Sequence, residues 1–223
     1  MNRPYIISHM MTSLDGRIDC GMTAKLPGVE EYYAALNKLN LTATLSGRVT
    51  AQLEMAKKGE FEAKNKEPLN AEKFSKKISA KEYSIAVDTK GSLLWQEHSQ
   101  VPLIIITSEA VAKEYLAYLD ERNISWIACG KERINLAKAM EILAEEFGVK
   151  RLGIVGGGTI NAGFLNEGLL DEISILLAPG IDGRKGMTAV FAGLPMETEP
   201  ISLKLKNVAQ YDSGALWLQY QTR

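Results

Sequence analysis

The chain has 223 residues, of which 46% are hydrophobic and 24% charged, with 26 Lys and Arg against 27 Asp and Glu. This length suffices to bury the core of one globular domain, and a net charge of −1 without a basic cluster argues against a nucleic-acid partner. No apolar run is long enough to span a bilayer and the N-terminus lacks a signal-peptide pattern, so we expect a cytoplasmic protein without membrane contact.

Short apolar runs with strand character alternate with helical patterns along most of the chain. We predict strands at Tyr5–His9, Thr42–Ser46, Tyr83–Val87, Leu103–Thr107, Ser125–Ala128, Leu152–Val155 and Ile173–Ala178. Apolar stripes predict helices within 29–39, 111–119 and 136–147, with Asn135 as the cap of the third. This alternation favours an α/β fold with a mainly parallel central sheet flanked by helices.

The last forty residues have a different pattern. Leu203–Val208 and Leu216–Gln219 flank Tyr211-Asp212-Ser213-Gly214, which predicts a C-terminal antiparallel β-hairpin. The segment Lys57–Lys81 is rich in Lys and Glu and has little apolar periodicity, so we expect a solvated excursion or lid. With no linker or repeat, we predict a single domain over residues 1–223, with a charged excursion near 57–81.

The cysteines and histidines do not suggest a metal. Cys20 and Cys129 lie far apart, and together with His9 and His98 they show no zinc-type spacing. We therefore expect reduced thiols and no structural metal.

Residues 156–158 are consecutive glycines between an apolar run and a helix expected to begin near Thr159. Glycines at such a junction allow unusual dihedral angles and the close approach of another molecule, and the first helical turn presents free N–H groups. The segment indicates a phosphate site of the nucleotide type, or else a tight turn required for helix–sheet packing. The standard dinucleotide fingerprint is not matched, because Asn161 occupies its third glycine position and the loop comes late in the chain.

Other motifs also follow predicted strands. Ser13-Leu14-Asp15-Gly16-Arg17 places an acid where ligands of open α/β sheets bind, although Asp-Gly also makes ordinary turns. Ser46-Gly47-Arg48-Val49-Thr50 suits a phosphate, or is a glycine turn with a surface arginine. In Thr107-Ser108-Glu109, Ser108 resembles an N-cap, and two hydroxyls at a helix start suit the 2′-phosphate of NADP. Asp171-Glu172 opens the strand after the glycine-loop helix.

The motifs that follow the predicted strands are, in order, SLDGR, SGRVT, ITSE and VGGGTIN followed by GLLDE. This set resembles the reductase family of riboflavin biosynthesis, the domain found C-terminal to the deaminase in bifunctional enzymes. The resemblance runs from about Pro4 to the final hairpin. It implies a dihydrofolate-reductase-like fold and NADPH-dependent reduction of a small-molecule substrate. That substrate would be a phosphoribosylamino-pyrimidine, whose ribose ring opens to a ribityl chain. A homodimer is also implied.

The resemblance further implies roles for individual residues. The cofactor diphosphate would be cradled by Gly156, Gly157, Gly158, Thr159 and Ile160. The rest of the cofactor would lie along Gly47, Arg48 and Thr50, with its adenosine phosphate near Thr107 and Ser108. On the substrate side, Asp15 and Glu172 would be the candidate catalytic acids, and Ser13 and Arg17 would bind substrate.

The chain departs from the family pattern in three places. Arg17 stands where many members carry lysine, so a bulkier planar guanidinium replaces a compact ammonium group. An Asp-Pro-Arg-Leu-Thr segment that usually helps to hold the substrate ribose and phosphate is absent, and the excursion from Lys57 takes its place. The zinc signature of the deaminase is absent as well.

Two other functions fit the same motifs. One is an NADPH-dependent reductase of another heterocycle or carbonyl compound, which the missing phosphate-binding segment favours. The other is a non-catalytic NADP(H)-binding protein, in which Asp15 and Glu172 would be structural. A standard dehydrogenase fold is disfavoured, because the glycine loop does not follow the first strand.

Overall fold

The structure is a computed structural model that describes residues 2–96 and 99–222. The chain divides into two compact units. Unit 1 contains residues 2–4 and 42–150, and unit 2 contains residues 5–41 and 151–222. The expectation that the chain forms a single domain stays a prediction. His98, one of the two histidines considered for metal binding, lies outside the described residues.

Unit 2 is built on strands in the order β11-β12-β10-β1-β9. β1 pairs in parallel with both β9 and β10, whereas β12 pairs antiparallel with β10 and β11. The strands are β1 (Tyr5–Thr12), β9 (Arg151–Gly156), β10 (Glu172–Leu177), β11 (Lys204–Gln210) and β12 (Leu216–Gln221). The predicted strands of this unit and the C-terminal hairpin are confirmed, and several ends extend further than expected.

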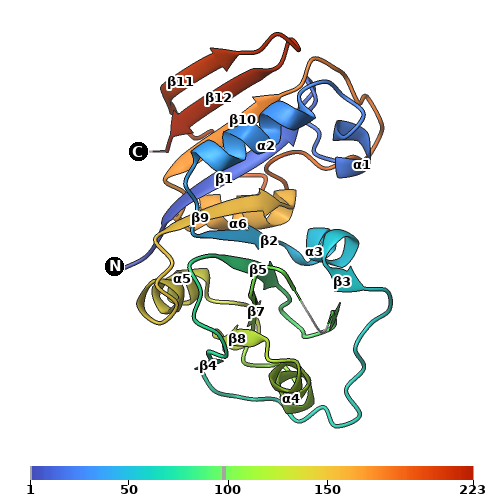
Figure 1. Cartoon of the computed structure of the whole chain (residues 1–223), viewed down its shortest axis with the longest axis vertical. Helices are drawn as coiled ribbons and strands as arrows, with labels where there is room; N and C mark the ends of the chain where they lie inside the picture. The colour runs from blue at the N-terminus through green and yellow to red at the C-terminus, as the bar shows by residue number, and fades with distance from the viewer. Residues whose placement is uncertain (1, 97–98, 223) are drawn as a thin grey trace. The chain divides into compact units, whose positions relative to one another are not determined.

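Helices cover both faces of β1 in unit 2 (Figure 1). Ile7 and Met11 pack with Ala35 of α2 (Val29–Lys38), which lies on one face. Ser8 points to the other face, because side chains alternate along a strand, and it meets α6 (Gly158–Asn166) there. A short helix, α1 (Cys20–Thr23), follows β1 and was not predicted.

Unit 1 contains strands in the order β2-β5-β7-β8-β4. β2, β5, β7 and β8 are mutually parallel, and β4 adds an antiparallel edge to β8. The strands are β2 (Ala43–Ser46), β4 (Lys73–Ser75), β5 (Tyr83–Val87), β7 (Leu103–Thr107) and β8 (Ser125–Ala128), with β3 (Ala56–Lys57) pairing separately with β6 (Leu94–Trp95). A mainly parallel sheet flanked by helices is therefore confirmed.

The helices of unit 1 follow the predicted stripes, with one addition. α4 (Lys113–Glu121) packs Tyr115 and Leu119 against Ala86 and Trp126 of the sheet. α5 (Leu136–Glu145) is capped by Asn135, whose side chain accepts from the Lys138 N–H at 3.0 Å, as predicted. α3 (Arg48–Glu54) was not predicted.

The charged excursion near 57–81 is bound to unit 1 along much of its length. The Phe61 ring lies 5.1 Å from the Tyr115 ring, and the Leu69 N–H donates to the Val111 carbonyl at 2.9 Å. The excursion also supplies β4, where Phe74 pairs with Ile127. Scattered apolar residues and backbone hydrogen bonds hold the segment against α4 and β8, while its residues remain exposed or half-buried throughout. The expectation of a solvated excursion or lid stays a prediction.

Candidate functional site

The glycine loop connects β9 to α6 and leaves the start of that helix without a side-chain cap. Gly157 is the N-cap residue, with φ at 94°, a conformation that favours glycine. No side chain of the described chain caps α6. The first-turn N–H groups of α6 therefore suit an anion, and Thr159 at that turn is exposed. The helix begins at Gly158, one residue before the predicted start.

A second segment, residues 187–192, packs against this helix start. A Cβ on Gly158 would lie 2.2 Å from the Ala189 carbonyl oxygen, so this glycine is required by packing within the protein. The Ala192 N–H donates to the Gly158 carbonyl at 3.2 Å. Asn161 is fully buried and donates to the Val190 carbonyl at 3.0 Å while accepting from the Ser8 hydroxyl at 3.0 Å. The packing alternative therefore explains Gly158, while Gly157 and the open first turn retain the features of a phosphate site.

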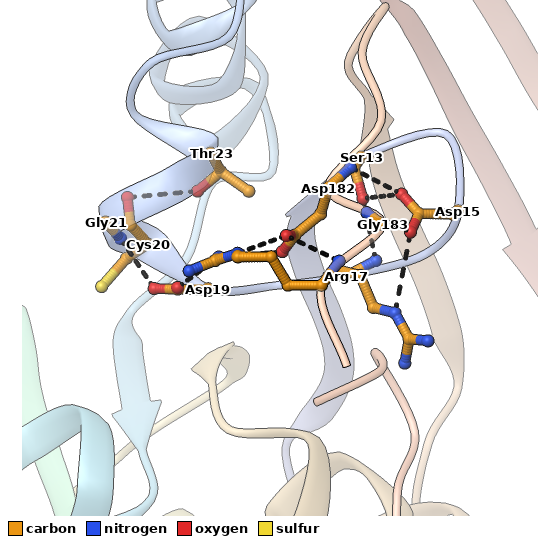
Figure 2. A network of polar contacts seen from close by, with 10 residues as sticks. Ser13, Asp15, Arg17, Asp19, Cys20, Gly21, Thr23, Asp182 and Gly183 are labelled. Atoms are coloured by element: carbon orange, nitrogen blue, oxygen red, sulfur yellow. Dashed lines mark hydrogen bonds and ion pairs between the residues drawn. The ribbon is translucent and has the colours of Figure 1, made fainter. Parts of the chain in front are cut away.

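The loop after β1 is held by a network centred on Asp15 (Figure 2). The Asp15 carboxylate accepts from the Ser13 hydroxyl at 2.7 Å and from the N–H groups of Asp182 and Gly183, both at 3.0 Å. These hydrogen bonds, the one from Ser13 first, hold the pKa of Asp15 well below its usual range. These contacts favour the ionised form of Asp15 at neutral pH.

Arg17 lies in the same network and has donor capacity to spare. Its Nη1 donates to the Met187 carbonyl at 2.7 Å, and its Nε lies 3.7 Å from the Asp15 carboxylate. That Nε is buried without a hydrogen-bond partner in the described residues. A buried guanidinium N–H without a partner is the kind of group that a ligand carbonyl or phosphate satisfies.

Beyond Arg17, a second arginine joins the two segments of the network. Arg184 Nη2 contacts Asp19 at 2.6 Å and Asp182 at 2.9 Å, and its Nε also pairs with Asp182. The loop after β1 is thereby tied to residues 182–184 by charge-assisted bonds. The residues 182–184 were not singled out from the sequence, where Asp-Gly-Arg looks like an ordinary surface turn.

Glu172 lies at the start of β10, at the far end from Asp15. In the β1–β10 pair Glu172 is in register with Ile7, whereas Asp15 follows Thr12, the last residue of β1. At about 3.3 Å per residue, the stretch from Ile7 to Thr12 separates the two ends by roughly 16 Å. The structure therefore does not bring the two predicted catalytic acids together.

The Glu172 carboxylate is fully buried and occupied by side chains. It accepts from Tyr5 at 3.1 Å, Lys206 at 2.7 Å and Gln219 at 2.8 Å. Lys206 sits at an irregularity in the β11–β12 register, and a bulge of this kind re-aims a side chain. Burial, followed by the Glu172 charge, raises the pKa of Tyr5 to about 12, so its phenol stays a donor. Both carboxylate oxygens of Glu172 are thus hydrogen-bonded within the protein, and its predicted catalytic role stays a prediction.

A buried series of hydrogen bonds through His9 also involves β10. The His9 Nε2 lies 3.2 Å from the Tyr32 carbonyl, which only accepts, so Nε2 carries the proton. Nδ1 then accepts from the Ser174 hydroxyl at 2.9 Å, and Ser174 accepts from the Trp217 indole at 2.8 Å. Burial lowers the pKa of His9 to about 4.

In unit 1 the predicted cofactor residues of the SGRVT motif lie at the end of β2 and the start of α3. Gly47 precedes the helix with φ at −70°, so it needs no glycine-specific conformation. Arg48 is exposed on the first turn, and Thr50 is half-buried two residues later. The surface-arginine alternative and the phosphate-binding role both remain compatible with this placement.

Thr107 and Ser108 do not begin a helix. α4 starts at Lys113 with Ala112 as its N-cap, so the prediction that Ser108 is an N-cap is wrong. Both residues are buried, and their hydroxyls donate to the Thr89 carbonyl at 3.0 and 2.9 Å. Their role in the structure is to hold the loop that follows β5.

That loop contains a buried acid that the sequence analysis did not single out. The Asp88 Oδ2 accepts from the Ser92 and Leu93 N–H groups at 2.8 Å and from the Tyr115 hydroxyl at 2.9 Å. The signal was present, because Asp88-Thr89-Lys90-Gly91 follows a predicted strand and has the composition of a turn.

The described part of the chain contains neither a membrane-spanning helix nor a metal-binding cluster. None of its helices is long and apolar enough to cross a membrane. Residues 2–96 and 99–222 also contain no cluster of three or more His, Cys, Asp or Glu suited to a metal. Cys20 and Cys129 are both free thiols.

The parallel strands with their flanking helices, the C-terminal hairpin and the glycine loop after β9 define an α/β protein of the dihydrofolate-reductase-like class. More particularly, the chain belongs to the family described as the RibD C-terminal domain, whose model matches residues 4–217.

Solved structures show the same fold. A pyrimidine reductase-like protein from Corynebacterium diphtheriae matches with a TM-score of 0.73 at 16% identity, over 99% of this chain and 92% of that one. The riboflavin biosynthesis reductase Rib7 of Saccharomyces cerevisiae matches with a TM-score of 0.63 at 18% identity, over 99% and 90%. RibD of Acinetobacter baumannii matches with a TM-score of 0.69 at 18% identity; 99% of this chain is covered, but only 58% of that protein.

Proposed function

We propose that this protein is an NADPH-dependent reductase of riboflavin biosynthesis that converts a phosphoribosylamino-pyrimidine to its ribitylamino form. The observation that carries the proposal is the family match over residues 4–217. A structurally similar protein from Thermotoga maritima, with a TM-score of 0.60, combines a deaminase with a 5-amino-6-(5-phosphoribosylamino)uracil reductase. The present chain covers 56% of that protein.

The glycine loop supports a nicotinamide dinucleotide as the cofactor. The uncapped first turn of α6 and the glycine-specific conformation of Gly157 fit a diphosphate that accepts backbone N–H groups. In our proposal Gly156, Gly157, Thr159 and Ile160 hold this diphosphate, while Gly158 keeps the helix start close to residues 187–192. When bound, the cofactor supplies a hydride to the substrate.

The loop after β1 is our proposed substrate side. Arg17 offers its Nε, which makes no hydrogen bond in the described residues, to an oxygen of the substrate, and Ser13 holds Asp15 in place. Asp15 is the residue that fixes the loop geometry through Asp182 and Gly183, and its ionised carboxylate orients a water that delivers the proton after hydride transfer. Glu172, at the other strand end, is assigned a structural function.

The proposal is tested by titrating purified protein with NADPH and, separately, NADH, following nicotinamide fluorescence. Adding the deaminated phosphoribosylamino-pyrimidine should then oxidise NADPH. Binding without oxidation would favour a reductase of another heterocycle or carbonyl compound, or a non-catalytic binding protein. If neither nucleotide binds, the proposal is wrong, and the glycine loop is a packing turn.

We also propose a homodimer in the cytoplasm. Support for the dimer comes from the family resemblance and from β11, where Leu205 and Val208 are 56% and 52% exposed. Leu205→Lys should weaken dimerisation, which sedimentation velocity measures. A parent protein that sediments as a monomer would contradict the proposal. Cell fractionation tests the location.

A further inference from the structure

Residues 180–189, the strap, are bound at both ends to the loop after β1. At the start of the strap, the Leu14 N–H donates to the Gly180 carbonyl at 2.7 Å. Near its end, the Ile18 N–H donates to the Thr188 carbonyl at 3.2 Å. Backbone contacts therefore fix the two ends of the strap, and its middle depends on other contacts.

The middle of the strap is mostly exposed, so packing contributes little to its position. Asp15 binds its backbone by accepting from the N–H groups of Asp182 and Gly183, both at 3.0 Å (Figure 2). Arg184 supplies a side-chain link, because its Nη2 contacts Asp19 at 2.6 Å and Asp182 at 2.9 Å. One guanidinium thus joins two acids from different segments, and its planar fork restricts the direction of both contacts.

The surroundings of Arg184 are poorly suited to an anion. Its single positive charge faces two carboxylates, those of Asp19 and Asp182. Hydrogen bonds from Arg184 hold the pKa of each of these acids below its usual range, which favours their ionised forms at neutral pH. An arginine in this setting is suited to joining two segments rather than to holding a phosphate.

The strap in turn holds the guanidinium of Arg17. Arg17 Nη1 donates at 2.7 Å to the carbonyl of Met187, a residue of the strap. Arg17 Nε lies 3.7 Å from the Asp15 carboxylate and makes no hydrogen bond in the described residues. Because a binding side chain is directed by the hydrogen bonds that support it, the position of the Met187 carbonyl helps to decide where Nε points.

Past Met187 the chain is held by the start of α6 instead. The Ala192 N–H donates to the Gly158 carbonyl at 3.2 Å, and the Val190 carbonyl accepts from the Asn161 amide at 3.0 Å. These contacts lie outside the middle of the strap. Loosening the middle should therefore leave the first turn of α6, the proposed diphosphate site, in place.

We propose that Arg184 is a positioning residue that keeps the strap closed on the loop after β1. With the strap closed, the Met187 carbonyl holds Arg17 toward the substrate. This inference rests on the proposed function. Arg184 acts through Arg17 and contacts neither substrate nor cofactor, so its replacement should weaken substrate binding and leave nucleotide binding unchanged.

The test compares the parent protein with Arg184→Glu, which places a third carboxylate beside Asp19 and Asp182. Arg184→Lys keeps the charge but loses the fork that contacts both acids. Lys185→Glu is the matched control, because it makes the same change of charge at the next exposed residue. Hydrogen–deuterium exchange of residues 181–187 is measured without ligand, followed by the KM for the pyrimidine and the dissociation constant for NADPH.

Arg184→Glu should speed exchange in residues 181–187 and raise the KM for the pyrimidine, each about tenfold, with NADPH affinity unchanged. Arg184→Lys should restore part of both losses, and Lys185→Glu should match the parent. In an Arg17→Gln background, Arg184→Glu should add less than about twofold to the KM, because its effect passes through Arg17.

The inference is overturned if Arg184→Glu leaves exchange or KM at the parent value, if it weakens NADPH equally, or if Lys185→Glu loses as much. Full additivity with Arg17→Gln would also overturn it. Each of these results leaves the reductase activity of the parent intact. A parent protein that does not oxidise NADPH with this pyrimidine overturns the proposed function, and the substrate role of Arg184 with it.

Discussion

The two ends of the β1–β10 strand pair use their acids in opposite ways. At the start of β10, Glu172 is fully buried and accepts from three side chains of the surrounding strands and hairpin. Past the end of β1, Asp15 is exposed and accepts from a neighbouring serine and two backbone N–H groups of a loop. The first arrangement ties the strands together, and the second shapes a loop next to a donor, Arg17 Nε, that makes no hydrogen bond in the described residues.

The role of an acidic residue next to a parallel strand therefore depends on whether it lies at the amino or the carboxyl end of that strand. Parallel strands place their ligand-binding loops at the carboxyl edge, where Asp15 lies. Glu172 opens its strand and therefore lies at the opposite edge. Four measurements test this division, and the largest effect is expected for Glu172.

Glu172→Gln should destabilise the protein by about 3 kcal/mol, because an amide nitrogen would face buried donors from Tyr5 or Gln219. Turnover per folded molecule should change little. Urea unfolding and activity measured on the folded fraction check both parts. A stable variant with abolished turnover would make Glu172 catalytic after all and reverse the comparison.

Lowering the pH should reduce the free energy of unfolding through the buried His9. The pKa of His9 is about 4 in the folded protein and about 6.5 when unfolded, so the unfolded state binds the extra proton between these values. Stability is therefore fully present above pH 6.5 and falls as the pH drops to 4, by up to about 3 kcal/mol. His9→Gln should flatten this slope in urea titrations at stepped pH; an unchanged slope would assign it to other groups.

Asp15→Asn should lower kcat, because the amide no longer orients the water that delivers the proton. It should also raise the KM for the pyrimidine about tenfold, because an amide cannot accept from both loop N–H groups and the serine hydroxyl together. The pKa of Asp15 is far below its usual range, so the parent enzyme should show no ionisation of Asp15 in its rate profile between pH 5 and 8. A limb in that range that vanishes in Asp15→Asn would identify Asp15 as the proton donor.

Arg17→Lys should have the smallest effect, a few-fold rise in the KM for the phosphorylated pyrimidine, because lysine keeps the charge but loses the Nε donor. NADPH affinity should stay at the parent value. Steady-state kinetics with a parallel fluorescence titration separate the two quantities. If NADPH affinity falls and KM does not, Arg17 belongs to the cofactor.

Much of this fold follows from local patterns. Three short, mostly buried strands have predicted bounds that match the structure, namely Tyr83–Val87, Leu103–Thr107 and Ser125–Ala128. α3 escaped prediction because it is only seven residues long and starts directly after a glycine. β4 has three residues in a charged stretch, and its strand character comes from pairing with β8.

The site was predictable only where the backbone itself carries the feature. The glycine loop could be recognised because its conformation requires glycine at position 157. The partners of Asp15 could not, since Asp182 and Gly183 lie far along the chain and bind through backbone groups that any residue has. Likewise, the hydroxyls of Thr107 and Ser108 are directed to Thr89 by tertiary contacts, which local sequence does not encode.

The two units differ in when their paired strands are synthesised on the ribosome. Most of unit 1 is one continuous stretch, Thr42–Lys150, whereas β1 of unit 2 pairs with strands made much later. Tyr5 and Glu172, joined by a hydrogen bond, are 167 positions apart. The nascent N-terminal strand therefore remains unpaired while most of the protein is translated, and its apolar side chains are open to aggregation or chaperone capture during that interval.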